Sequence, residues 1–112
     1  MIELPLPEKI STNIIYSGVH WTKRSSHKNL YREYTKHYFK EAPVEKYPVE
    51  ITYEFEFVKN ALDTTNCSYM AKLLEDSLVI HGVLKDDSPK YVSATHIYSA
   101  KGTTDSVKIT IK

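Results

Sequence analysis

The chain has 112 residues and a mass of 12.9 kDa, which suffices for one hydrophobic core and not for two. Apolar residues make up 41% and charged residues 26%, which excludes wholesale disorder. The apolar run Leu78-Val79-Ile80 is far shorter than the roughly 20 residues that span a bilayer, and the N-terminus lacks the layout of a secretion signal. With a lone cysteine, Cys67, these features predict a single cytoplasmic domain over residues 1–112.

The charges are segregated along the chain, although the formal net charge is only +1. Residues 20–40 hold six basic side chains against one acidic one, and residues 41–63 hold six acidic against two basic ones. Such a basic block predicts a surface for a polyanion. We assign phosphate contacts to Lys23, Arg24, Lys28, Arg32 and Lys36. The aromatic residues among them either stack on bases or sugars or belong to the core: Tyr16, Trp21, Tyr31 and Tyr34.

The first part of the chain predicts a strand, a loop and a helix. Residues 2–7 alternate apolar and polar side chains and are broken by proline, which suits a short edge strand. Residues 8–26 show no clear period and predict a long functional or mobile loop. Residues 29–40 have the pattern of an amphipathic helix with a basic face. The apolar side chains at a spacing of four on that helix are Leu30, Tyr34 and Tyr38.

The second part of the chain predicts a strand, a helix and two further strands. Residues 49–57 alternate strictly between apolar and polar side chains. Capping residues beginning at Asp63 precede a helical apolar pattern that ends at Gly82. Strands are expected over 91–100 and 107–112, paired as an antiparallel hairpin. The element order predicts an α+β fold with a small mixed sheet and two main helices.

Acidic residues bracket the second helix and allow two interpretations. Asp63 can cap the helix, and Asp86 and Asp87 are typical of a turn. Lys72 and Asp76 lie four residues apart and suit an ordinary helical ion pair. Alternatively, the carboxylates hold a hard cation such as Mg²⁺, and the lysine faces a bound phosphate. Spacing alone favours the structural interpretation.

The same residues resemble the signature of the RusA family of Holliday-junction resolvases. That family shows Asp-x-Asp-Asn opening a helix, then a lysine, Asp-x-Leu four residues later, a glycine and an Asp-Asp turn. The order of a proline-broken strand, a basic segment, a helix, a strand and a closing strand also agrees, so the resemblance extends over essentially the whole chain. The residues that match the signature are Asp63, Asn66, Lys72, Asp76, Leu78, Gly82, Asp86 and Asp87.

The resemblance implies a RusA-like homodimer, a small phage or prophage endodeoxyribonuclease in the cytoplasm of a bacterial host. It implies paired symmetric hydrolysis of four-way (Holliday) DNA junctions that depends on Mg²⁺, with Mn²⁺ as a substitute. The implied catalytic residues are Asp63, Lys72 and Asp87, and the implied metal ligands are Asp63, Asp86 and Asp87. The implied supporting residues are Thr65, Asn66 and Asp76.

Thr65 departs from the family pattern, because the second aspartate of Asp-x-Asp normally stands there. Metal affinity should fall without that charge. A second alignment, three residues later, would put Asn66 and Ser68 in the two aspartate positions and leave no carboxylate there, so we prefer the first, which keeps Asp63. The departure leaves open a second function, a weakened or inactive protein of the same fold that binds branched DNA. A third hypothesis, a small structural or interaction protein of a phage, predicts no DNA binding at low salt.

Overall fold

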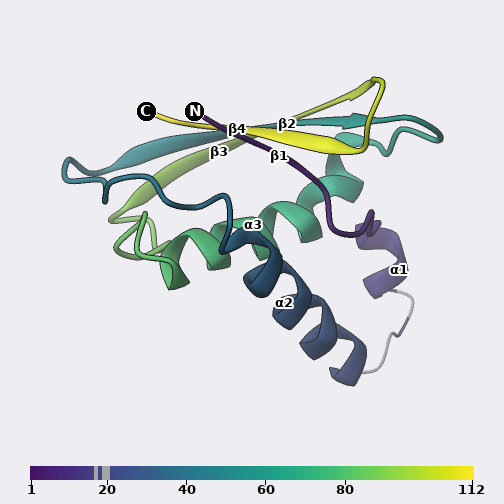
Figure 1. Ribbon diagram of the computed structural model, residues 1–112, viewed down its shortest axis with the longest axis horizontal. Helices are drawn as coiled ribbons and strands as arrows, with labels where there is room; N and C mark the ends of the chain where they lie inside the picture. Colours follow the sequence, from purple (N-terminus) through teal and green to yellow (C-terminus); the bar gives the residue numbers. More distant parts are fainter. Residues whose placement is uncertain (17, 19–20) are drawn as a thin grey trace.

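Four strands and three α-helices make up the part of the chain that the computed structural model describes, residues 1–16, 18 and 21–112. The chain is a compact α+β globule with a radius of gyration of 13.5 Å, in which the helices cover one face of the sheet (Figure 1). In chain order the elements are β1 (Ile2–Pro5), α1 (Thr12–Tyr16), α2 (Trp21–Thr35), β2 (Val49–Phe57), the 3₁₀ turn η1 (Thr64–Cys67), α3 (Ser68–Ile80), β3 (Val92–Lys101) and β4 (Ser106–Ile111).

The strands form one mixed sheet in the order β1-β4-β2-β3. The central strand β2 runs parallel to β3 and antiparallel to β4, and β4 pairs antiparallel with the edge strand β1. At the middle of the sheet Tyr53 lies between Ile97 of β3 and Ile109 of β4. A parallel pair needs a crossover connection, and α3 supplies it between β2 and β3.

The predicted hairpin of the last two strands is wrong, because β2 lies between them. The backbone N–H of Gly102 donates to the carbonyl of Phe57 at 2.9 Å, so the turn after β3 passes the end of β2. The physical reason is that β2 has an apolar face to bury. A strand that lies between two others is hydrogen-bonded along both edges, and in this position the apolar face of β2 lies beneath the helices.

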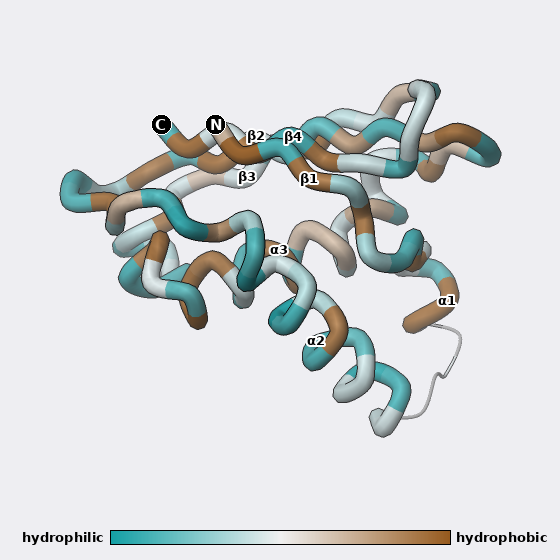
Figure 2. Tube along the Cα trace, viewed as in Figure 1, coloured by the Kyte–Doolittle hydropathy of each residue, from teal (hydrophilic) through white to brown (hydrophobic). Residues whose placement is uncertain are grey.

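The predicted strand over 49–57 and the predicted edge strand at the N-terminus are confirmed. The apolar side chains of β2 are at most 1% exposed, apart from Val49, whereas its glutamates face the open side of the sheet. The apolar stripe of α3 is buried as well, and Figure 2 shows hydrophobic stretches along the strands and along α3, which lies beneath the sheet in this view. The buried side chains of the two elements are Ile51, Tyr53, Phe55, Phe57, Met70, Leu73, Leu74 and Leu78.

The loop predicted over 8–26 is wrong, because α1 and the first turns of α2 lie there. Likewise, α2 begins at Trp21 and ends at Thr35 rather than extending over 29–40. Its buried face consists of His27, Tyr31 and Thr35, whereas Leu30 is 38% exposed and Tyr38 is 36% exposed. The Tyr16 side chain, predicted either to stack on DNA or to join the core, lies outside the described part of the structure, as do residues 17, 19 and 20 of the predicted loop.

Hydrogen bonds explain why α2 buries polar residues that carry no hydrophobic signal. The imidazole Nδ1 of His27 and the hydroxyl of Tyr69 in α3 are 3.1 Å apart. The Thr35 hydroxyl donates to the carbonyl of Tyr31 at 2.6 Å, and the Tyr31 hydroxyl donates to the carbonyl of Glu8. Because buried polar groups are tolerated when they are hydrogen-bonded, α2 can pack a face that sequence periodicity does not reveal.

The two ends of α3 are capped in different ways. Gly82 adopts φ +80°, its N–H donates to Val79, and the N–H of Val83 donates to the carbonyl of Leu78 at 2.9 Å. This is a Schellman motif, so the predicted glycine stop is confirmed. The predicted side-chain cap at Asp63 is wrong, because its carboxylate makes no capping hydrogen bond and η1 precedes the helix instead.

Among the described residues, no helix is both long and apolar enough to cross a membrane.

Candidate functional site

Helix α3 and the turn after it bring one lysine and two aspartates together. The ammonium of Lys72 lies 3.0 Å from Oδ1 of Asp76, one turn further along α3, and 2.7 Å from Oδ2 of Asp87. The chain reverses after α3 because the N–H groups of Val83 and Leu84 both donate to one carbonyl of the helix. This reversal carries Asp87 back to a lysine that lies 15 residues earlier in the sequence.

The charges of this cluster, Lys72, Asp76 and Asp87, stabilise one another. The hydrogen bond to Asp87 is the main cause that raises the pKa of Lys72 well above its usual value. The same hydrogen bond lowers the pKa of Asp87. The Lys72 side chain is nevertheless 60% exposed, so the ion pairs contribute little to stability and the charged groups remain accessible to a ligand.

Glu75 and Tyr53 support the cluster, and sequence reasoning missed both. The phenol of Tyr53 donates a hydrogen bond of 3.0 Å to Oε1 of Glu75. Burial raises the pKa of Glu75, and the negative charges of Asp87 and Asp76 raise it further. The strict alternation in β2, which puts Tyr53 on the helix-facing side, was the signal that could have indicated such a partner.

Asp63, by contrast, does not join the cluster. Its side chain is exposed and forms neither a hydrogen bond nor an ion pair with Lys72, and its backbone carbonyl accepts from the N–H of Asn66 at 2.9 Å. Thr65 is exposed and its carbonyl accepts from the Ser68 hydroxyl at 2.8 Å, while Asn66 is half-buried. Of the residues predicted for the site, the structure therefore gathers Lys72, Asp76 and Asp87.

The two clustered carboxylates are the type of donor that Mg²⁺ prefers. Mg²⁺ is usually held by one or two carboxylates together with substrate phosphates and water, and Asp76 and Asp87 both approach a single nitrogen atom closely. Within residues 1–16, 18 and 21–112, no three Asp, Glu, His or Cys side chains are arranged to hold a metal ion. Asp86 is half-buried and makes no ion pair with a described residue. The oxygen donors that fit the ion are therefore the carboxylates of Asp76 and Asp87.

Four basic residues form a stripe along α2. Arg24, Lys28, Arg32 and Lys36 follow one another at intervals of four, a spacing that places side chains on one helix face. We call them the basic stripe. All four are exposed, and the N–H of Lys36 donates to the Arg32 carbonyl, which continues the helical geometry past Thr35. Lys23 is also exposed on α2.

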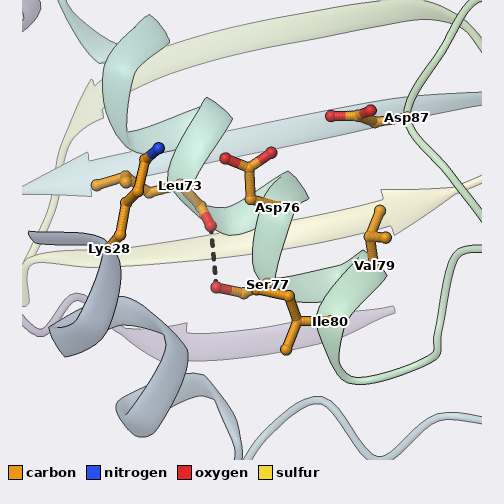
Figure 3. A pocket seen from close by; sticks show the side chains of 7 residues that line it. All are labelled: Lys28, Leu73, Asp76, Ser77, Val79, Ile80 and Asp87. Atoms are coloured by element: carbon orange, nitrogen blue, oxygen red, sulfur yellow. Dashed lines mark hydrogen bonds between the residues drawn. The ribbon is translucent and has the colours of Figure 1, made fainter. Parts of the chain in front are cut away.

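The basic stripe borders the carboxylates. Lys28 lines the same cavity as Asp76 and Asp87 (Figure 3).

The aromatic residues of the basic block have different surroundings. Tyr31 is fully buried and belongs to the core. Tyr34 is half-buried, with its ring centroid 5.5 Å from that of Tyr38. Trp21 is 69% exposed at the start of α2, and of these three it has the largest exposed share for stacking on a base.

A comparison of the chain with known protein families, curated proteins and solved structures finds no match. The features of the molecule that can indicate a function are therefore the Lys72, Asp76 and Asp87 cluster and the basic stripe beside it.

Proposed function

We propose that the chain is a RusA-like, Mg²⁺-dependent endodeoxyribonuclease that acts on four-way DNA junctions as a homodimer. The observation that supports this most is the pair of carboxylates from α3 and the following turn around Lys72. The basic stripe next to that pair adds the surface that a DNA backbone requires.

The basic stripe binds the phosphates of one DNA arm. Side chains four residues apart on a helix are separated by about 6 Å along its axis, so the stripe offers a row of cations rather than a single contact. Lys28 lies at the cavity that also contains Asp76 and Asp87. A strand bound along the stripe therefore passes close to the carboxylates.

The side chains of the cluster have separate tasks in hydrolysis. Asp76 and Asp87 would hold Mg²⁺, which would supply Lewis-acid polarisation of the phosphate and a bound water of lowered pKa. Lys72 stays protonated at neutral pH because its pKa is raised, and its ammonium donates to the negative charge that develops on the attacked phosphate. The hydrogen bond from Tyr53 fixes Glu75 and so orients the face of α3 that carries these groups.

A homodimer presents two such clusters related by a two-fold axis. A four-way junction has matching symmetry, so two identical subunits cut two strands at equivalent positions. Paired symmetric nicks are the result that this arrangement predicts.

A nicking assay on a synthetic four-way junction, labelled on each strand in turn, tests the proposal. We expect paired nicks with Mg²⁺ or Mn²⁺ and none with a chelator. Asp87→Asn should abolish nicking, whereas the matched variant Asp86→Asn should cut normally, because, of these two neighbouring carboxylates, it is that of Asp87 that contacts Lys72. Cutting that survives both the chelator and Asp87→Asn would refute the proposed site.

A second candidate function is junction binding without cleavage. It is favoured by one observation, that Lys72 already forms an ion pair with each of the two clustered carboxylates, while Asp63 makes no contact with that lysine. In that case the wild-type protein should bind the junction tightly at low salt and leave every strand intact with either metal. A failure to bind any DNA at low salt would exclude both candidates and favour a structural or interaction protein.

A further inference from the structure

A cavity of about 290 Å³ opens beside the cluster, lined by residues of α2, α3 and the turn after α3. Leu73, Val79 and Ile80 give it an aliphatic wall, and Ile80 is 58% exposed at this surface. In Figure 3 the side chain of Lys28 crosses that of Leu73 at the left of the view, and the carboxylates of Asp76 and Asp87 lie toward the right. The cavity thus combines an aliphatic wall with one cation and two anions.

The polar groups that can meet a ligand here are the charged ones. The hydroxyl of Ser77 is already used, because it donates to the carbonyl of Leu73 at 2.9 Å. Asp76 and Asp87 accept from Lys72, but an ionised carboxylate has about four acceptor sites, so both retain acceptors for further donors. A fitting ligand therefore has an apolar body, an anionic end for Lys28 and a donor edge for the carboxylates.

We propose that this cavity takes one unstacked nucleotide of the bound DNA, an inference that rests on the proposed function. The base lies against Leu73, Val79 and Ile80, its phosphate faces Lys28, and its amino group donates to Asp76 or Asp87. Taking a base out of the stack is least costly where its environment in the duplex is already disturbed, and stacking between neighbouring arms is interrupted at the centre of an open junction.

The same geometry selects among bases. Adenine, cytosine and guanine carry exocyclic amino groups that a carboxylate accepts, as in the pairing of Asp or Glu with cytosine. Thymine has no amino group, and its single ring N–H lies between two carbonyl oxygens that the carboxylates repel. The nucleotide in the cavity is therefore one of the three amino-bearing bases.

Four-way junctions that carry a single 2-aminopurine near the crossover test the inference directly. This fluorescent purine has an exocyclic amino group and brightens when it leaves the base stack. We expect a several-fold rise at one position in each of two symmetric strands when the protein binds, because the cavity wall is aliphatic and offers no ring for stacking. Replacing the natural base at that position by thymine should weaken junction binding about tenfold.

Two variants with the same added charge provide the control. Ile80→Lys places a long cationic side chain in the cavity, so it should abolish the fluorescence rise while the added charge keeps or increases junction affinity. Val58→Lys alters another exposed aliphatic residue, in the loop after β2 and outside the cavity lining, and should keep the rise.

The outcomes separate this inference from the proposed function, since fluorescence anisotropy reports junction binding independently. Tight binding with no position that brightens, or brightening that persists in Ile80→Lys, would overturn the nucleotide cavity alone. Equal affinity for a thymine at the responding position would overturn the contact with the carboxylates. An absence of junction binding at low salt would overturn the proposed function and this inference together.

Discussion

The hydroxyl of Tyr53 on β2 reaches Glu75 on α3 at 3.0 Å and so connects the middle of the sheet to the helix that carries Lys72 and Asp76. The ring of Tyr53 is fully buried, with neighbouring strands on both sides. Only its hydroxyl is used for a polar contact with the helix. This hydrogen bond therefore joins the middle of the sheet to the helix that carries the candidate site.

We expect Tyr53→Phe to lower the free energy of unfolding by about 1 kcal/mol, because the ring still packs but partly buried Glu75 loses a donor. Denaturant unfolding followed by circular dichroism measures the change. Tyr98→Phe is the matched control. Tyr98 pairs with Glu54 on the open side of the sheet and is 59% exposed, so its loss of a hydroxyl should leave stability unchanged. Equal effects in the two variants would contradict the role given to the Tyr53 hydroxyl.

The basic stripe predicts a defined salt dependence of DNA binding. Each cation that contacts a phosphate contributes about 0.9 to the slope of log K against log salt concentration. The double variant Lys28→Ala/Arg32→Ala should therefore reduce the slope by about 1.8, measured by anisotropy with a labelled junction. Lys112→Ala, an exposed lysine next to β4, should keep the wild-type slope. An unchanged slope in the double variant would remove α2 from the DNA surface.

Lys72→Ala should affect activity far more than stability. Nicking should be lost, while the free energy of unfolding should fall by less than about 1 kcal/mol because the lysine is largely exposed. Lys85→Ala, an exposed lysine in the turn after α3, is the control for nicking. A loss of stability as large as that of a core variant would assign Lys72 a mainly structural role.

The small stability effect of Lys72 should itself depend on pH. Because the pKa of Asp87 is lowered in the folded protein, its ion pair with Lys72 stabilises the fold at neutral pH. This stabilisation is lost as the pH falls through the acid range, below about 4. The raised pKa of Lys72 means that its contribution is lost only as the pH rises past about 10. The difference in unfolding free energy between wild type and Lys72→Ala should thus shrink at both ends of that range. A difference that grows at pH 3 would contradict the ion pairs.

Gly82 gives a prediction about backbone conformation alone. An added Cβ would meet no atom within 4 Å, but φ is +80°. Gly82→Ala should therefore lower the free energy of unfolding by about 1 kcal/mol through strain, and Gly82→Asn by less, because asparagine tolerates this conformation better. Thermal unfolding of the two variants measures the order. Equal stability of Gly82→Ala and wild type would show that the turn relaxes.

Sequence predicted the fold best where burial follows a simple period. The alternation through Phe55 and the apolar stripe through Leu74 identified β2 and the core of α3. The sequence predicted only the second half of α2, because that helix buries His27 and Thr35 by hydrogen bonding rather than by apolar character, and it did not predict α1. The order of the strands was also missed, since a short turn between β3 and β4 does not indicate that a third strand lies between them.

The candidate site was predictable only in its local part. A spacing of four was enough to pair Lys72 with Asp76. The contact with Asp87 depends on how the chain reverses after Gly82, which a spacing of 15 residues does not define. The position of Asp63 outside the cluster depends on the 3₁₀ turn η1, and no residue pattern before α3 distinguished that turn from a helix start.

The position of β2 in the sheet constrains the order in which the fold forms during synthesis. Both neighbours of β2 come later in the chain, and β1 pairs only with β4, the last strand. While the ribosome is still translating residues before β3, no strand has its partner in the sheet. Until the later strands are made, the aromatic face of β2 can pack only against α3. A nascent chain arrested before β4 should therefore resist protease poorly, however much of α3 it already contains.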